Sequence, residues 1–98
     1  MLLHIRPSPK PQKRLRATFK LESGKIQTID FGYKGGETYI DHGDKKKREN
    51  YISRHRAREE NLWRNAGRTP ASLSRYILWG PSRNIDKNIA SYKARYGY

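Results

Sequence analysis

Residues 44–63 of this 98-residue chain read DKKKRENYISRHRAREENLW. Asp44 is a candidate N-cap, and no Gly or Pro follows before Gly67, so the stretch predicts a helix of about five turns. One face of this helix is a basic and polar stripe, formed by Lys46, Lys47, Asn50, Arg54, Arg58 and Asn61. The opposite face is expected to pack against the rest of the chain, and it carries Arg48, Tyr51, Ile52, His55, Glu59, Leu62 and Trp63.

Upstream of the helix, residues 13–31 predict a β-hairpin. An apolar series alternates with a polar one, as in a half-buried strand: Leu15, Ala17, Phe19 and Leu21 against Arg14, Arg16, Thr18 and Lys20. The turn Glu22–Gly24 leads into a second strand with Ile29 and Phe31 on one face. Because a two-stranded hairpin is marginally stable alone, its apolar face needs the helices or a third strand. Residues Thr38–Ile40 are the candidate for that strand, and a loop is the alternative.

Two further helices are expected in the C-terminal third. Thr69 caps the first, with Pro70 at its first position, and Gly80 followed by Pro81 ends it. Its apolar face carries Leu73, Tyr76 and Ile77. The second begins near Ser82 or Asn84 and has a narrow apolar stripe of Ile85, Ile89, Tyr92 and Tyr96.

The predicted fold is therefore α+β, with an N-terminal β-hairpin or three-stranded antiparallel sheet followed by three helices. Residues 13–98 are expected to form this single small domain. Residues 1–12 are expected to be a flexible basic and Pro-rich arm, because Pro7, Pro9 and Pro11 favour an extended, polyproline-like chain.

The net charge is the clearest indication of a partner. The chain has 22 Lys and Arg against 9 Asp and Glu, a formal charge of +13. A magnitude of about 2–8 is enough to keep a small domain soluble, so the excess favours a polyanionic partner. Interleaved Arg and aromatic residues favour nucleic acid over an acidic protein or a membrane surface, and a solvated basic surface is the alternative. The chain has no cysteine, which excludes disulfides and Cys-based zinc sites.

Two sets of candidate functional residues follow from these patterns. The residues expected to contact a phosphate backbone are Lys46, Lys47, Arg54, Arg58, Lys13, Arg14 and Arg16. The residues expected to form a structural network between the helices are Arg48, His55, Glu59, Trp63 and Trp79.

A metal-dependent nuclease is a further hypothesis, because Asp41, His42, Asp44, His55 and Glu59 fall within nineteen residues. The turn and cap positions of the two aspartates, and the packing-face position of His55, favour structural roles instead. We therefore expect no catalytic residue, no metal, no cofactor and no enzymatic activity.

Several motifs follow one another in a specific order. They are Phe31-Gly-Tyr-Lys-Gly35, Tyr39-Ile-Asp-His-Gly-Asp44, Tyr51-Ile-Ser-Arg-His55, Arg58-Glu59, Thr69 and Ser74-Arg-Tyr-Ile-Leu-Trp-Gly-Pro81. Over residues 13–96 this order resembles a family of short basic proteins of unknown function encoded by nucleocytoplasmic large DNA viruses, the giant viruses. Arg54, His55, Arg75 and Trp79 occupy matching positions, whereas the family has Trp where this chain has Tyr76. The resemblance implies a viral protein located in the virion or in the infected host cell, in its viral factory or nucleus.

We therefore expect a small basic viral protein that binds DNA, or RNA, mainly through the phosphate backbone and that could be packaged with the genome. DNA is favoured over RNA, other virion proteins are further candidate partners, and no membrane partner is expected. The main alternative is a virion structural protein, such as a minor capsid or core cement protein, that uses basic and aromatic surfaces for protein contacts. A metal-dependent nuclease is the third possibility.

Overall fold

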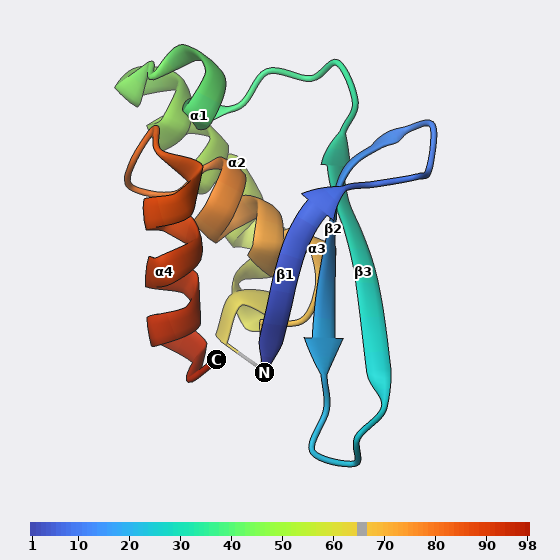
Figure 1. Cartoon of the computed structure of the whole chain (residues 1–98). Coiled ribbons are helices and arrows are strands. Elements are labelled where there is room, and N and C mark those ends of the chain that lie inside the picture. Colours follow the sequence, from blue (N-terminus) through green and yellow to red (C-terminus); the bar gives the residue numbers. More distant parts are fainter. Residues whose placement is uncertain (65–66) are drawn as a thin grey trace.

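The computed structural model describes residues 1–64 and 67–98 and shows the expected α+β fold. Three strands form an antiparallel sheet in the order β1 (Leu2–Pro7), β2 (Lys13–Lys20) and β3 (Ile26–Tyr33). The helices follow in the sequence and gather on one side of this sheet (Figure 1). The central strand β2 has the predicted alternation only in part: Ala17 and Phe19 are fully buried and Lys20 is exposed, but Thr18 of the predicted polar side is buried as well.

The helical part consists of α1 (Tyr39–His42), α2 (Lys45–Arg64), α3 (Pro70–Leu73), the π-helical turn η1 (Ser74–Leu78) and α4 (Ile85–Tyr96). The two predicted caps are present, and Asn84 caps α4, which was expected to begin near Ser82 or Asn84. Asp44 accepts hydrogen bonds from the first amides of α2, Thr69 from the amide of Ser72, and Asn84 from the first amides of α4. Within residues 1–64 and 67–98, no helix has the length and apolar character needed to cross a membrane.

The N-terminal segment differs from the prediction, because Leu2–Pro7 is an edge strand and not an arm. It pairs antiparallel with β2, and Leu2, opposite Phe19, is buried in the core. Pro7 is tolerated there because an edge strand does not need every amide for pairing. The first residues thus supply the third strand, whereas Thr38–Ile40, the expected candidate, caps and begins α1.

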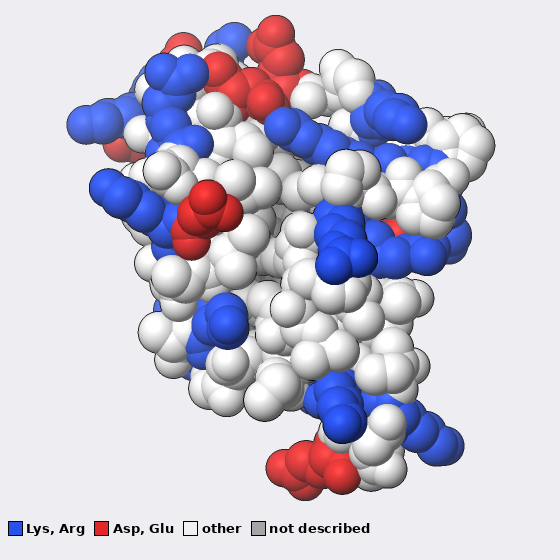
Figure 2. Space-filling model, viewed as in Figure 1, with Lys and Arg blue, Asp and Glu red and all other residues white. Residues whose placement is uncertain are grey.

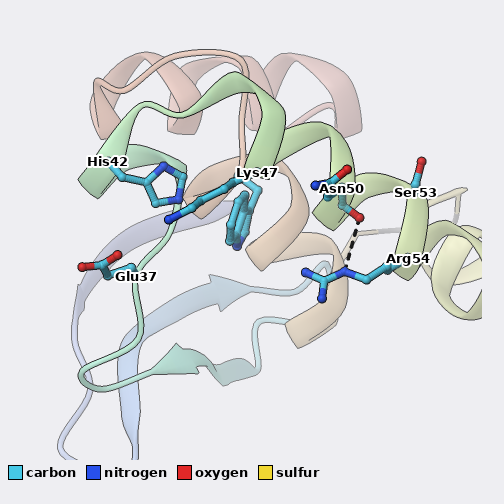
Figure 3. A pocket seen from close by; sticks show the side chains of 7 residues that line it. Glu37, His42, Lys47, Asn50, Ser53 and Arg54 are labelled. Atoms are coloured by element: carbon cyan, nitrogen blue, oxygen red, sulfur yellow. Dashed lines mark hydrogen bonds between the residues drawn. The ribbon is translucent and has the colours of Figure 1, made fainter.

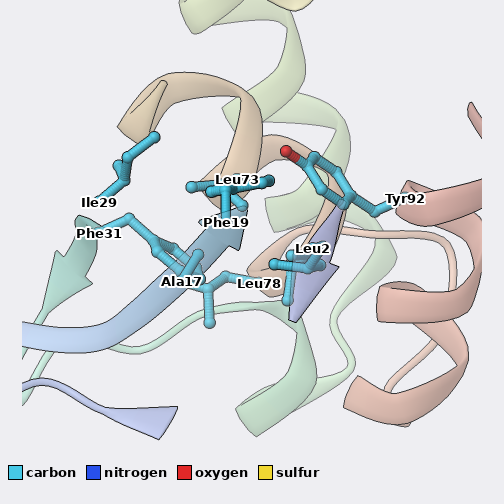
Figure 4. Packing of buried hydrophobic residues seen from close by; sticks show 9 residues of the cluster. Leu2, Ala17, Phe19, Ile29, Phe31, Leu73, Leu78 and Tyr92 are labelled. Atoms are coloured by element: carbon cyan, nitrogen blue, oxygen red, sulfur yellow. The ribbon is translucent and has the colours of Figure 1, made fainter. Parts of the chain in front are cut away.

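The core lies between the sheet and the short segment formed by α3 and η1. Its largest cluster comprises Leu2, Ala17, Phe19, Ile29, Phe31, Leu73, Ile77, Leu78 and Tyr92 (Figure 4). No residue of α2 is among the members of this cluster. The short helical segment at residues 70–78, rather than the long helix, is therefore the element around which the described part of the chain packs.

Helix α2 packs through rings and polar groups more than through aliphatic side chains. Tyr51 and Trp63 are buried on the predicted packing face. Leu62 was expected to pack there as well, but it is 40% exposed. Ile52 is only partly buried and borders a shallow surface depression. The predicted place of Leu62 on the packing face is therefore wrong, whereas Trp63, the next residue, is buried as predicted.

The π-helical turn was not predicted, because the sequence pattern of residues 70–79 is that of an ordinary helix. The amide of Trp79 donates to the carbonyl oxygen of Ser74, five residues earlier, at 2.9 Å. Ile77 and Leu78 are thereby both buried in the core cluster. At Gly80 a Cβ atom would lie 2.4 Å from the carbonyl oxygen of Tyr76, so only glycine fits where the turn ends.

Candidate nucleic-acid interface

The exposed face of α2 is a stripe of cations that form no ion pair with the described residues. All six residues of the predicted stripe are exposed: Lys46, Lys47, Asn50, Arg54, Arg58 and Asn61. None of its four cations forms an ion pair within the described ranges, and Arg54 donates only to the carbonyl oxygen of Asn50, at 3.4 Å. Lys47 and Arg58 are separated by roughly 16 Å along the helix axis, at about 1.5 Å per residue. The stripe can therefore follow a run of phosphates along a nucleic-acid strand.

Two adjoining surface hollows lie beside this stripe. The first has a volume of about 460 Å³, and the side chains that line it are Glu37, His42, Lys47, Asn50, Ser53, Arg54 and Trp79 (Figure 3). The second has a volume of about 430 Å³ and shares Glu37 and Trp79 with the first. Lys13 of β2 lines the second hollow. The fold thus places Lys13 at a hollow that adjoins the one lined by Lys47 and Arg54, although Lys13 is far from them in the sequence.

Aromatic rings form a wall of these hollows. Tyr51 stacks on Trp79 with ring centroids 4.2 Å apart and planes at 5°, and His55 stacks on Tyr51 at 4.0 Å. His42 meets the Trp79 ring edge-on at 5.5 Å. Burial, with a further contribution from the charge of Glu59, raises the pKa of Tyr51 to about 12. Trp79 remains partly exposed, so its uncovered surface faces the hollows.

Four members of the predicted structural network lie together around this wall. The Nε atom of Arg48 donates to the carbonyl oxygens of Trp79 and Gly80, at 3.1 and 3.0 Å. His55 Nδ1 and Glu59 Oε2 are 2.5 Å apart and hydrogen-bond along the helix. The Arg48 hydrogen bonds join the start of α2 to the residues that follow η1, whereas the His55–Glu59 hydrogen bond lies within α2.

Trp63, the fifth predicted member, lies in a separate group. Its ring meets Tyr76 edge-on at 6.3 Å, and the guanidinium of Arg75 lies over it at 5.3 Å. Its buried Nε1 atom has no hydrogen-bond partner among the described residues. The sequence therefore predicted one network where the structure has two.

Two of the predicted phosphate contacts on β2 are engaged in ion pairs. Arg14 forms two hydrogen bonds with the carboxylate of Asp41, at 2.7 and 2.8 Å. Arg16 binds Asp30 in the same way, at 2.9 and 3.1 Å, and the Asp30 side chain is only 7% exposed. Each guanidinium holds the pKa of its partner carboxyl well below the usual range. We therefore assign Arg14 and Arg16 to the structure and retain Lys13 as the candidate contact on this strand.

The five side chains of the nuclease hypothesis are engaged in hydrogen bonds within the protein. Asp41 accepts from an arginine of β2, and Asp44 caps α2. His42 Nδ1 accepts from the amide of Asp44, whereas His55 and Glu59 bind each other. In the part of the chain that the structure describes, no three such side chains form a group able to hold a metal ion.

Sequence reasoning missed Glu37 and the position of Arg75. Glu37 lines both hollows, and nothing in its glycine-punctuated segment marked it for a site. Arg75 contacts Trp63 and Tyr76 between the helices. Its place in the motif that begins at Ser74 was the one sequence signal that could have singled it out.

Comparison with known proteins gives one match. No curated protein matches the chain, and no solved structure matches it. A family model described as "Family of unknown function (DUF5754)" matches residues 3–55, which span β1, β2, β3, α1 and the first half of α2. Since this match covers more than half of the 98 residues, the chain belongs to this family of unknown function.

Proposed function

We propose that this protein binds nucleic acid, with DNA preferred over RNA, mainly through the phosphate backbone. The proposal rests on a row of exposed cations on α2 that form no ion pair in the described part of the chain: Lys46, Lys47, Arg54 and Arg58. Lys13 extends this row from the other side of the adjoining hollows. Cations without acidic partners can neutralise phosphates and release the counterions condensed on them, which is the main source of sequence-independent affinity.

In this proposal the backbone runs along α2 and passes across the mouth of the hollows to Lys13, without entering the hollows. Glu37 lines both of them, and its carboxylate would repel a phosphate placed inside. The charge of the whole chain assists, because a formal charge of +13 attracts a polyanion before contact is made. Basic side chains lie over several elements of the face that carries α4 and β1 (Figure 2), so this attraction is not confined to α2.

The motif resemblance supports a setting for this activity in a large DNA virus. A small protein with this charge would lower the repulsion between packed phosphates, which fits a component that is packaged with the genome. This setting is part of the proposal, and the binding itself can be tested without it.

The test is the affinity for a fluorescently labelled duplex and for the same strand alone, measured by anisotropy over a series of salt concentrations. Five contacting cations predict a slope of log K against log salt of about −4.5 for the duplex and about −3.5 for the single strand. The expected outcome is binding that weakens steeply as salt rises. An absence of binding to either form at about 50 mM salt would refute the proposal.

A further inference from the structure

Three arginines from three separate elements surround a pocket that the nucleic-acid proposal does not use. Arg48 comes from α2, Arg75 from η1 and Arg95 from α4. The pocket has a volume of about 260 Å³, and its other lining residues are Tyr76, Pro81, Ser91 and Tyr92. No carboxylate lines it, and none of the three arginines forms an ion pair within residues 1–64 and 67–98.

The arginines are held in place with donors to spare. Arg48 uses Nε to bind two carbonyl oxygens, and its guanidinium lies 5.6 Å from the centroid of the Tyr39 ring, whereas its terminal nitrogens form no hydrogen bond within the described ranges. The guanidinium groups of Arg75 and Arg95 lie 4.7 and 4.3 Å from the centroid of the Tyr76 ring. Arg75 is mostly buried, its Nε has no partner among the described residues, and one terminal nitrogen reaches the carbonyl oxygen of Trp79 at 3.5 Å. Arg95 also hydrogen-bonds to Tyr96. A guanidinium carries five N–H donors, so most donors of these three groups still form no hydrogen bond to the described residues.

The electrostatics of the pocket favour an anion. Burial lowers the pKa of Arg75; Tyr76 opposes this shift, and the like charges of Arg48, Arg56 and Arg95 add to it. A mostly buried cation that meets other cations without a counter-charge destabilises the fold. A bound anion would remove this repulsion and satisfy the unpaired donors at the same time.

We propose that this pocket binds a phosphate group, either as free phosphate or as the terminal phosphate of a small phosphomonoester. Guanidinium groups from three directions match a tetrahedral oxyanion, and their planar forks bind phosphate oxygens in pairs. The Ser91 hydroxyl lines the same pocket and can donate a further hydrogen bond, whereas the Tyr92 hydroxyl is already bound to the carbonyl oxygen of Gly67. The site is separate from the α2 stripe, because no residue of that stripe and neither hollow residue Lys13 nor Glu37 lines it.

Calorimetric titration of the whole chain with inorganic phosphate, with adenosine 5′-monophosphate and with adenosine tests the proposal at constant ionic strength. Saturable binding of phosphate, together with a rise in the thermal midpoint, is expected. Tighter binding of the monophosphate than of phosphate would identify a phosphomonoester as the ligand, and equal binding would identify free phosphate. The proposal is overturned if neither phosphate compound binds, or if adenosine binds as tightly as its monophosphate.

Variants locate the site. Arg95→Gln is the first choice, because Arg95 is exposed and its loss should leave the fold intact. It should weaken phosphate binding about tenfold, as expected for the loss of one hydrogen bond to a charged group. Lys93→Gln removes the same charge from an exposed position of α4 that does not line the pocket, and it should bind like the unaltered protein. Equal affinity of the Arg95→Gln and Lys93→Gln variants would place phosphate elsewhere and refute the assignment. Arg75→Gln provides a second measurement, with the near-ultraviolet circular dichroism spectrum reporting whether it folds.

Discussion

Replacing three cations of the α2 stripe tests whether this surface contacts phosphates directly or whether nucleic acid is attracted only by the overall positive charge of the protein. In the variant Lys47→Ala, Arg54→Ala and Arg58→Ala, three exposed side chains without ion pairs are removed. Each phosphate contact contributes about 0.9 to the slope of log K against log salt, so the slope for duplex DNA should fall from about −4.5 to about −1.8. At about 100 mM salt the same three contacts correspond to a loss of roughly 500-fold in affinity.

The matched control removes the same charge from other places. Lys20→Ala, Lys25→Ala and Lys93→Ala alter exposed residues at the β2–β3 turn and on α4, away from the α2 stripe and the hollows. Because this control also lowers the net charge by three, it reports the effect of general attraction alone. Its salt slope should stay close to that of the unaltered protein.

Fluorescence anisotropy at several salt concentrations measures both slopes, and thermal unfolding followed by circular dichroism shows that both variants fold. Exposed substitutions of this kind usually change stability by no more than about 0.5 kcal/mol each. The reasoning is refuted if the α2 variant keeps its slope, or if the control loses as much as the α2 variant. In either case the cations on α2 would not be the contact surface.

Three further predictions follow from burial and from ionisation. Leu73→Ala should lower the free energy of unfolding, measured by chemical denaturation, by about 2–5 kcal/mol, because Leu73 is fully buried in the core. Leu62→Ala should lower it by less than about 1 kcal/mol, because Leu62 is 40% exposed. Arg16 holds the folded-state pKa of Asp30 below the ordinary value of 3.8. The stability that this pair contributes is therefore complete above about pH 5 and is lost as the pH falls through the folded-state pKa. In the Asp30→Asn variant, the thermal midpoint should fall less steeply with decreasing pH than in the unaltered protein. The pKa of Tyr51 is raised from 10.0 to about 12, so its contribution to stability is complete below pH 10 and is lost as the pH rises through 12. A Tyr51→Phe protein with the same alkaline decline as the unaltered protein would contradict this assignment.

The local features of this fold could be predicted because they depend on neighbouring residues alone. The alternation at Ala17 and Phe19, the caps at Asp44 and Thr69, and the separation of α2 into a basic and a packing face are all present in the structure. Each is set by the period of a strand or helix, or by a side chain that binds amides within three residues. The cations of the α2 stripe and their exposure were therefore readable from the sequence.

Contacts between distant segments could not be read in the same way. Pairing of Leu2–Pro7 with β2 depends on a register that three prolines in the first twelve residues conceal. The ion pairs of Arg14 and Arg16 with carboxylates of other segments remove two cations from the predicted interface. Such partners depend on which faces meet in the folded chain, which local periodicity does not specify.

Only the tertiary structure brought together the groups of both proposed sites. The sequence by itself determined that α2 carries a basic face, since that face is a property of one helix. It did not determine that the π-helical turn at residues 74–78 places Arg75 beside Arg48 and Arg95, nor that Trp79 stacks on Tyr51 beside the cleft. The physical reason is that the hydrogen bond from Trp79 to Ser74, five residues earlier, forms where η1 packs against the core on one side and against α2 and α4 on the other. These packing contacts exist only in the assembled fold.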